Sequence, residues 1–230
     1  MKFLSGFVLF LGLWATTVPL AQAAIAPVGP FTGSIGETWE SFPNYTVPGP
    51  VTFLSDPTTI FGGDASISNP LMVIYEPSAG ATFGLINSGS AAVSDGVKGM
   101  GINNLDFHTA PATITFATGV STFGGYWGAA TVGSDAVVAV SFFDAGGGLL
   151  GADSFTYNHE STSNGALDWH GWMSTTPIMS LTYSGNLVVN DGLQANVIPE
   201  PEIYVMLAAG LGLIGFVARR KKKPQENAAA

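Results

Sequence analysis

The sequence predicts an all-β domain, a sandwich of jelly-roll type, and three observations lead to that prediction. Across residues 24–197 no apolar stripe recurs at three- and four-residue spacing, and the helix-favouring residues Lys, Arg, Gln and Glu are scarce. Short β-branched and aromatic runs are present instead, separated by Gly, Pro, Asn and Asp. Thirty glycines and fourteen prolines supply many turns, while 47% hydrophobic content argues against disorder. These patterns are typical of two packed sheets.

The predicted strands follow one another along the chain at spacings of mostly about eight to twenty residues. Residues 112–116 alternate between apolar and polar side chains, so one face of that strand is expected to be exposed. Residues 137–143 are almost continuously apolar, which predicts a central strand with Phe142 or Phe143 facing the core. The full set is Leu71–Tyr75, Thr82–Ile86, Ala112–Phe116, Val137–Phe143, Ser154–Tyr157, Ile178–Tyr183 and Leu193–Val197.

A hairpin is predicted around the glycine-rich turn at residues 145–148, because glycine readily adopts positive φ. Asp144 and Asp153 flank this turn and would be the ligands of a calcium site. An EF-hand-type loop, however, would place Gly146 and Gly148 at ligand positions, where they offer no side-chain oxygen. The sequence therefore favours turn chemistry over metal binding.

Composition and charge exclude several classes of protein. The chain has no cysteine, which excludes disulfides, thiolate metal sites, iron–sulfur clusters and a cysteine nucleophile within it. Residues 24–198 contain thirteen acidic residues and a single basic one, Lys98, a net charge of −12. Nucleic-acid binding needs clustered Lys and Arg, so it is excluded. An acidic surface instead suits a secreted protein that net charge keeps in solution, or one that meets cations.

The N-terminus has the features of a secretory signal peptide over residues 1–23. Lys2 precedes the apolar stretch of residues 3–13, and Ala21 and Ala23 are the small residues that signal peptidase requires at a cleavage site. Export by this route makes signal peptidase the first expected partner.

The C-terminus has the features of a stop-transfer segment. Residues 203–218 contain no charge and would span about 24 Å as a helix, close to the hydrocarbon thickness of a bilayer. A cluster of five cations follows and by the positive-inside rule lies in the cytoplasm, together with a tail at residues 224–230. The sequence thus predicts a membrane-anchored precursor with its acidic domain outside. The five cations are Arg219, Arg220, Lys221, Lys222 and Lys223.

An extended tripeptide, Pro199-Glu200-Pro201, lies just ahead of the apolar segment. The tripeptide, the apolar segment and the basic cluster together make residues 197–223 resemble the PEP-CTERM sorting signal. The resemblance implies processing near the tripeptide by an exosortase, a membrane-embedded protease-like enzyme of Gram-negative bacteria. Such tails also occur on some ice-binding proteins and on many exopolysaccharide-associated surface proteins. Glu202 and residues 224–230 depart from the pattern, and Glu202 would shift the cut.

No catalytic motif is present, so neither enzymatic activity nor a cofactor is expected. The sequence lacks HExxH, GxSxG and DxDxDG patterns. Glu37 and Glu40 are three residues apart, a spacing that does not bring two glycosidase acids together on a strand. Three histidines have acidic neighbours, and we interpret them as ion pairs on the surface rather than as half of a metal site or a catalytic dyad. These groups are Asp106 with His108, His159 with Glu160, and Asp168 with His170.

Aromatic residues are the remaining candidates for ligand binding. Sugar-binding proteins stack pyranose rings on aromatic side chains, and most such rings in a sandwich belong to the core. Trp169 and Trp172 are expected to be an exposed pair and hence a candidate glycan platform. The others considered are Trp39, Tyr126 and Trp127.

The sequence therefore predicts a signal peptide over residues 1–23, an extracellular all-β domain over residues 24–196 and a sorting signal over residues 197–223. From the resemblance we expect a structural component of an exopolysaccharide or biofilm matrix. A lectin-like carbohydrate-binding domain is the alternative, and a secreted hydrolase is the third. Ice binding ranks lower, because no regular Thr-x-Thr array is visible along the chain.

Overall fold

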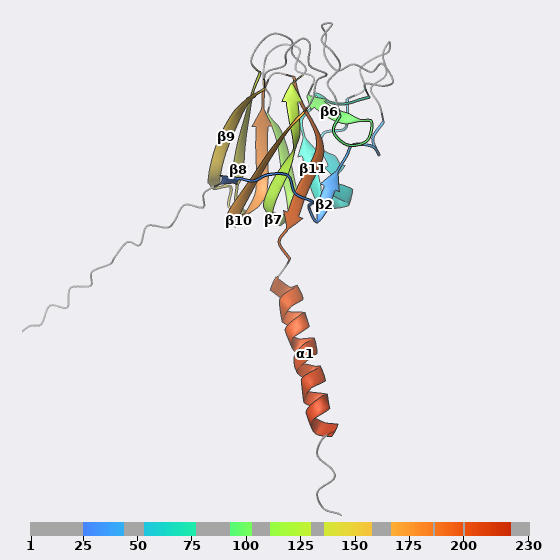
Figure 1. Cartoon of the computed structure of the whole chain (residues 1–230), viewed down its shortest axis with the longest axis vertical. Helices are drawn as coiled ribbons and strands as arrows, with labels where there is room; N and C mark the ends of the chain where they lie inside the picture. The colour runs from blue at the N-terminus through green and yellow to red at the C-terminus, as the bar shows by residue number, and fades with distance from the viewer. Residues whose placement is uncertain are drawn as a thin grey trace, which may run out of the picture.

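The structure is a computed structural model, shown in Figure 1. It describes residues 25–43, 53–76, 93–102, 111–129, 136–157, 167–185, 187–199 and 201–221. The predicted signal peptide with Ala21 and Ala23, and the predicted strand Thr82–Ile86, lie outside the described residues.

The described part of the chain is mostly β-strand with one α-helix, which confirms the all-β prediction. The 3₁₀ helix η1 spans Phe61–Gly63. The strands in chain order are β1 (Ala26–Pro27), β2 (Ile35–Glu37), β3 (Thr58–Ile60), β4 (Ala65–Ser68), β5 (Met72–Tyr75), β6 (Gly99–Ile102), β7 (Ala112–Ala129), β8 (Ala136–Phe143), β9 (Leu149–Tyr157), β10 (Asp168–Ser184) and β11 (Val188–Val197).

Backbone hydrogen bonds join all these strands into one antiparallel sheet. Its main path runs β5-β6-β11-β7-β10-β8-β9, and the short strands attach to it, β1 to β10, β2 to β11, and β3 through β4 to β7. β8, which contains residues 137–143, pairs with both β9 and β10, so it is an interior strand as predicted, but it lies next to the edge strand β9 and Val137 is exposed. The predicted alternation at residues 112–116 is also confirmed, since the apolar side chains are buried and Thr115 is exposed.

The sheet folds back on itself, and this closure creates the core. Phe142 of β8 is the register partner of Leu181 on β10. Trp172 lies nine residues before Leu181 on the same strand, a distance of roughly 30 Å if β10 were straight. The rings of Phe142 and Trp172 are nevertheless 5.2 Å apart. β10 must therefore bend sharply, which brings its two halves into facing layers.

The two longest strands bend at the same place. β7 and β10 shift register between Met173 and Ile178, and Gly119 of β7 lies against Pro177 of β10. A Cβ atom on Gly119 would come within 2.7 Å of the Cβ atom of Pro177, so only glycine fits there without displacement. A sandwich of two separate sheets, as predicted, is thus replaced by one sheet whose long strands belong to both layers.

The core between the layers is aromatic and aliphatic. The prediction that Phe142 or Phe143 faces inward is confirmed, because Phe142 is 0% exposed. The largest fully buried side chains of the described residues come from both halves of the sequence, so the two halves share one core. They are Trp39, Trp127, Trp172, Tyr75, Tyr183, Phe123, Phe142, Ile60, Ile67, Met72, Ile74 and Met100.

A single helix, α1 (Pro201–Lys221), follows the sheet and extends away from it in Figure 1. It is longer at both ends than the predicted residues 203–218. Among the residues that the structure describes, no helix combines the length and apolarity needed to cross a membrane.

Candidate functional site

The proline-containing tripeptide lies at the junction between sheet and helix. Pro199 is exposed and follows β11, where the last backbone bond runs from the Ile198 N–H to the Gly119 carbonyl oxygen at 2.9 Å. Proline has no N–H, so Pro199 ends the ladder. Pro201 is the first residue of α1, a position that suits its fixed φ. Glu200 lies outside the described residues.

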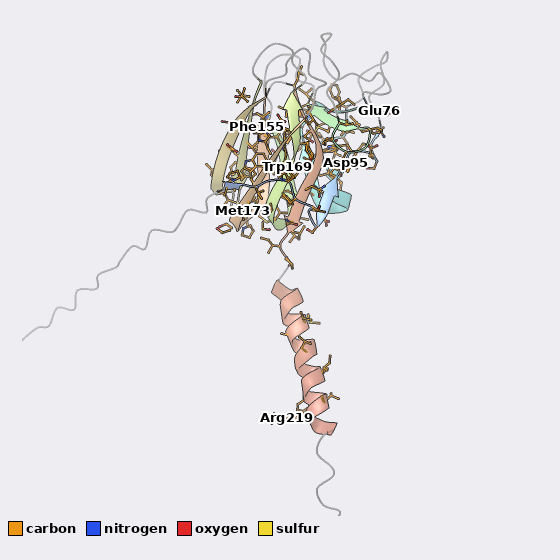
Figure 2. All side chains as sticks on the ribbon, in the orientation of Figure 1. Glu76, Asp95, Phe155, Trp169, Met173 and Arg219 are labelled. Carbon is orange, nitrogen blue, oxygen red and sulfur yellow. The ribbon has the colours of Figure 1, made fainter. Side chains whose placement is uncertain are left out.

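The helix that follows carries an unbroken apolar surface from Met206 to Val217, and its described side chains are exposed. Arg219 lies near the end of α1 that is farther from the sheet (Figure 2). The cations Arg220 and Lys221 belong to α1, whereas Lys222 and Lys223 lie outside the described residues. The exposed large apolar residues of α1 are Met206, Leu207, Leu211, Leu213, Ile214, Phe216 and Val217.

The expectation that Trp172 is exposed is wrong. Its side chain is 1% exposed and stacks with the ring of Phe123 at 6.4 Å and 9°. Its indole N–H donates to Asp153 Oδ2 at 2.8 Å. Residues three apart on a strand point to opposite faces, so Trp169 and Trp172 do not share a surface. The bend of β10 then places Trp172 between the layers.

Trp169 lies on the outer face of the sheet and is half-buried. Its ring occupies the space that side chains at Gly124 and Gly171 would fill, with the nearest indole atoms 2.6 Å and 2.9 Å from the Cβ positions there. The indole N–H donates to the Val28 carbonyl oxygen at 3.0 Å, which holds the ring in place. Two glycines thus form a shelf for a fixed indole ring.

Two further rings stand edge-on to Trp169. Tyr126, its register partner on β7, has its ring centroid 5.3 Å away at 76°, and Phe31 has its centroid 5.5 Å away at 88°. We call Phe31, Tyr126 and Trp169 the outer aromatic cluster. Sequence reasoning missed Phe31, because it is far from the other two residues in the sequence and no local pattern connects it to them.

His170 packs against an aromatic ring. Its imidazole stacks on the Phe155 ring with centroids 3.6 Å apart, and burial lowers the pKa of His170 although Asp168 and Asp153 oppose that shift. Within the described ranges no three His, Cys, Asp or Glu residues gather as metal ligands. The groups around His108 and His159 lie outside those ranges.

The carboxylates of Glu37, which is buried, and Glu40, which is exposed, both accept hydrogen bonds from backbone N–H groups. Glu37 accepts the N–H groups of Trp39 at 3.0 Å and Phe61 at 2.8 Å, two residues that have positive φ. Glu40 accepts the N–H groups of Val97 and Lys98, so the two glutamates serve different segments rather than one reacting bond.

Asp191 is also fully buried and accepts the Ser94 and Asp95 N–H groups, and burial raises the pKa of its carboxyl. These bonds connect Ser94 and Asp95 to β11. The carboxylate therefore supports a loop beside Tyr126 and the neighbouring Gly192.

The predicted hairpin at residues 145–148 is confirmed. Asp144 Oδ1 accepts the N–H groups of Gly146 and Gly148, both at 2.8 Å, so this carboxylate organises the turn as expected. Asp153 instead accepts the N–H groups of Ser154 and of the Trp172 indole.

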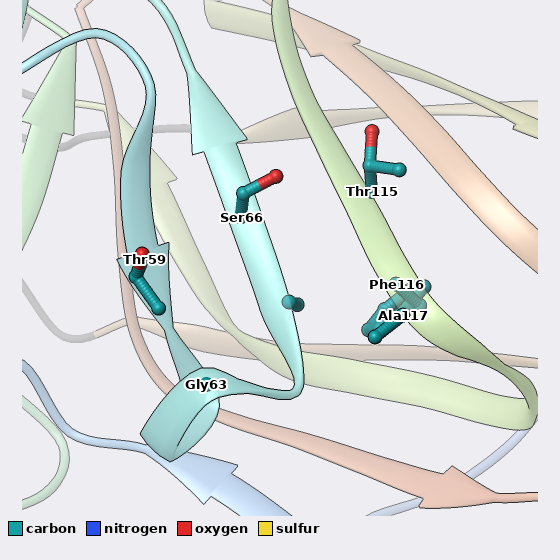
Figure 3. A pocket seen from close by; sticks show the side chains of 7 residues that line it. Thr59, Gly63, Ser66, Thr115, Phe116 and Ala117 are labelled. Carbon is teal, nitrogen blue, oxygen red and sulfur yellow. The ribbon is translucent and has the colours of Figure 1, made fainter.

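A shallow groove of about 240 Å³ crosses the outer face of β3, β4 and β7 (Figure 3). Thr59, Ser66 and Thr115 lie side by side there because they are register partners on three neighbouring strands. The groove has no charged lining residue and no group that would act as an acid or base.

Residues 197–222 match the family described as the PEP-CTERM protein-sorting motif. The chain therefore carries this sorting motif at its C-terminus, and the resemblance seen in the sequence is confirmed. No curated protein matches the sequence.

The similar solved structures are distant. A DUF4465 family protein from Bacteroides caccae is 11% identical, with a TM-score of 0.37, 73% of this chain covered and 99% of that chain. The CBM22-1–GH10 modules of endo-1,4-β-D-xylanase 10B from Clostridium thermocellum, complexed with xylohexaose, are 10% identical, with a TM-score of 0.37, 74% of this chain covered and 29% of that chain.

Proposed function

We propose that this protein is an exported, membrane-anchored precursor that an exosortase cleaves near Pro199–Pro201 to deliver the β domain to the cell surface or the extracellular matrix. The observation that carries the proposal is the PEP-CTERM motif at residues 197–222, which begins at the last residue of β11 and includes the exposed helix α1. The uncharged segment at residues 203–218 and the following cations support anchoring of the precursor. The N-terminal features of residues 1–23 support export by signal peptidase.

Processing is tested by mass spectrometry of the protein from a host with an exosortase. The mature protein is expected to lack residues beyond about position 201. The Pro199→Ala, Pro201→Ala double variant is expected to stay at full length, because the motif would be lost. An intact C-terminus in the wild-type protein would contradict the proposal.

Topology is tested independently of processing, in a host without an exosortase. Protease added to spheroplasts is expected to digest the β domain while an epitope placed after Lys223 survives. Protection of the β domain would show that it is not exported.

For the β domain itself we propose the role of a structural component of the extracellular matrix. Carbohydrate binding is the second candidate for its function. The outer aromatic cluster favours it, since Trp169 lies on a glycine shelf, held by its bond to Val28, and needs no rearrangement to offer a ring to a sugar. Ser94 and Asp95, which lie with Tyr126 around Gly192, would supply polar contacts.

A glycan array of the β domain tests this candidate. Binding is expected to fall at least about tenfold in Trp169→Ala, since stacked aromatic residues dominate such contacts. Phe53→Ala is the matched control, because Phe53 is an exposed aromatic residue outside the cluster. Equal binding by both variants, or no bound glycan, would leave the structural role as the conclusion.

A further inference from the structure

The end of β11 is hydrogen-bonded to the rest of the β domain along both of its edges. Val197 N–H donates to Ser34 Oγ at 2.9 Å, and the Ser34 hydroxyl donates to the Ala195 carbonyl oxygen at 3.3 Å. On the other side, Val197 is the register partner of Val120. The next residue, Ile198, donates to the Gly119 carbonyl oxygen.

The sorting motif therefore begins inside the sheet rather than after a linker. The match to the motif starts at residue 197, which is still part of β11. Only Pro199 and Glu200 separate the last sheet bond from the first residue of α1. Two residues reach at most about 7 Å, which leaves no free extended segment ahead of the tripeptide.

A protease cleft takes up its substrate as an extended strand of several residues, using the backbone N–H and C=O groups. In the folded domain the N–H groups of Val197 and Ile198 and the carbonyl oxygen of Ala195 already have partners in Ser34 and Gly119. An exosortase that binds its substrate in this way would compete with the β domain for the same backbone atoms.

We propose that the β domain limits its own processing, and that exosortase cleaves the form in which the end of β11 has detached from Ser34 and Gly119. This inference rests on the proposed function and adds that detachment of the end of β11 limits the rate of cleavage. The extent of detachment follows from burial, since Ala195 is 0% exposed and Leu193 is 0% exposed, whereas residues 196–198 are only half-buried. In this proposal residues 196–199 detach while the core stays intact.

When opening and closing are fast relative to cleavage, the rate of proteolysis follows the population of the open form. Any change that loosens residues 196–198, or supplies free chain ahead of Pro199, is then expected to speed processing. Cleavage would also be slower in the folded precursor than in one whose β domain is still unfolded, because the latter has no β11 to detach.

The test is a pulse–chase of the full chain in a host with an exosortase, following the ratio of cleaved to full-length protein. The principal variant has Gly-Ser-Gly-Ser inserted between Ile198 and Pro199, which keeps every bond of β11 and adds free chain. Its matched control carries the same insertion between Gly146 and Gly147, in the exposed turn of the predicted hairpin. The insertion ahead of Pro199 is expected to raise the processing rate at least about fivefold, and the control is expected to match the wild type.

A second pair tests the bonds themselves. Ser34→Ala removes the acceptor for Val197 N–H and is expected to speed processing about two- to tenfold. Ser66→Ala is the control, because Ser66 is a half-buried serine on β4, away from β11. Urea unfolding of each variant shows that the core is intact.

Equal processing rates in the wild type, the inserted chain and Ser34→Ala would overturn this inference while leaving exosortase processing in place. Absence of cleavage in every chain, or cleavage that survives the loss of both Pro199 and Pro201, would overturn the proposed function and this inference with it.

Discussion

Replacing Phe142 by alanine tests whether the sheet closes on itself as described. Phe142 of β8 is 0% exposed and pairs with Leu181 in the second half of β10. Its ring nevertheless lies 5.2 Å from that of Trp172, which belongs to the first half of β10. Removing a fully buried phenylalanine ring costs about 3–5 kcal/mol of unfolding free energy, because the apolar transfer energy is lost and a cavity remains. For a domain of this size that is a fall in melting temperature of about 6–20 °C.

The matched control is Phe143→Ala. Phe143 is the next residue on β8, is half-buried, and points to the opposite face of the strand. Its loss is expected to cost about 1 kcal/mol. Urea unfolding of the β domain, monitored by tryptophan fluorescence and fitted with a common slope, measures both values. Equal losses for the two variants, or a larger loss for Phe143→Ala, would refute the assignment of Phe142 to the closed core.

Three further predictions follow from single contacts. Gly119→Ala is expected to destabilise the domain by about 1–3 kcal/mol in urea because its Cβ would lie 2.7 Å from Pro177, whereas Gly29→Ala meets nothing within 4 Å and should be neutral. Burial lowers the pKa of His170, so the unfolded chain binds the proton more strongly and folding stability falls as the pH drops below about 6.5. His170→Gln should reduce that loss of stability between about pH 8 and about pH 5, and an unchanged dependence of unfolding free energy on pH would contradict the burial of His170. Asp144→Ala removes the acceptor for Gly146 and Gly148 and should cost about 1 kcal/mol, with the exposed Asp168→Ala as its control.

Several features of this protein were readable from the sequence because they depend on near neighbours in the chain. The strand class follows from alternation and β-branched runs, and the turn after Asp144 follows from its glycines, which the structure confirms. The sorting motif is likewise a linear pattern. Pro199 ends the pairing of β11 and Pro201 begins α1, and both effects come from the proline ring itself rather than from tertiary contacts.

The candidate site depended on contacts that sequence spacing does not contain. Trp169 and Trp172 are close in the chain and equally aromatic, and only the strand phase and the bend of β10 decide that Trp172 is 1% exposed while Trp169 lies outside. The bond that fixes Trp169 comes from Val28, 141 residues away.

Whether the domain has one sheet or two was also decided by tertiary structure. Each strand run predicts a strand, but its partners are chosen by long-range pairing, and β7 and β10 proved long enough to belong to both layers. Local pattern located β5 and β7 to β11 but not the short strands, and it stopped well short of the full lengths of β7 and β10. Packing determined which aromatic rings remain at the surface, because burial depends on the faces that the folded sheet brings together.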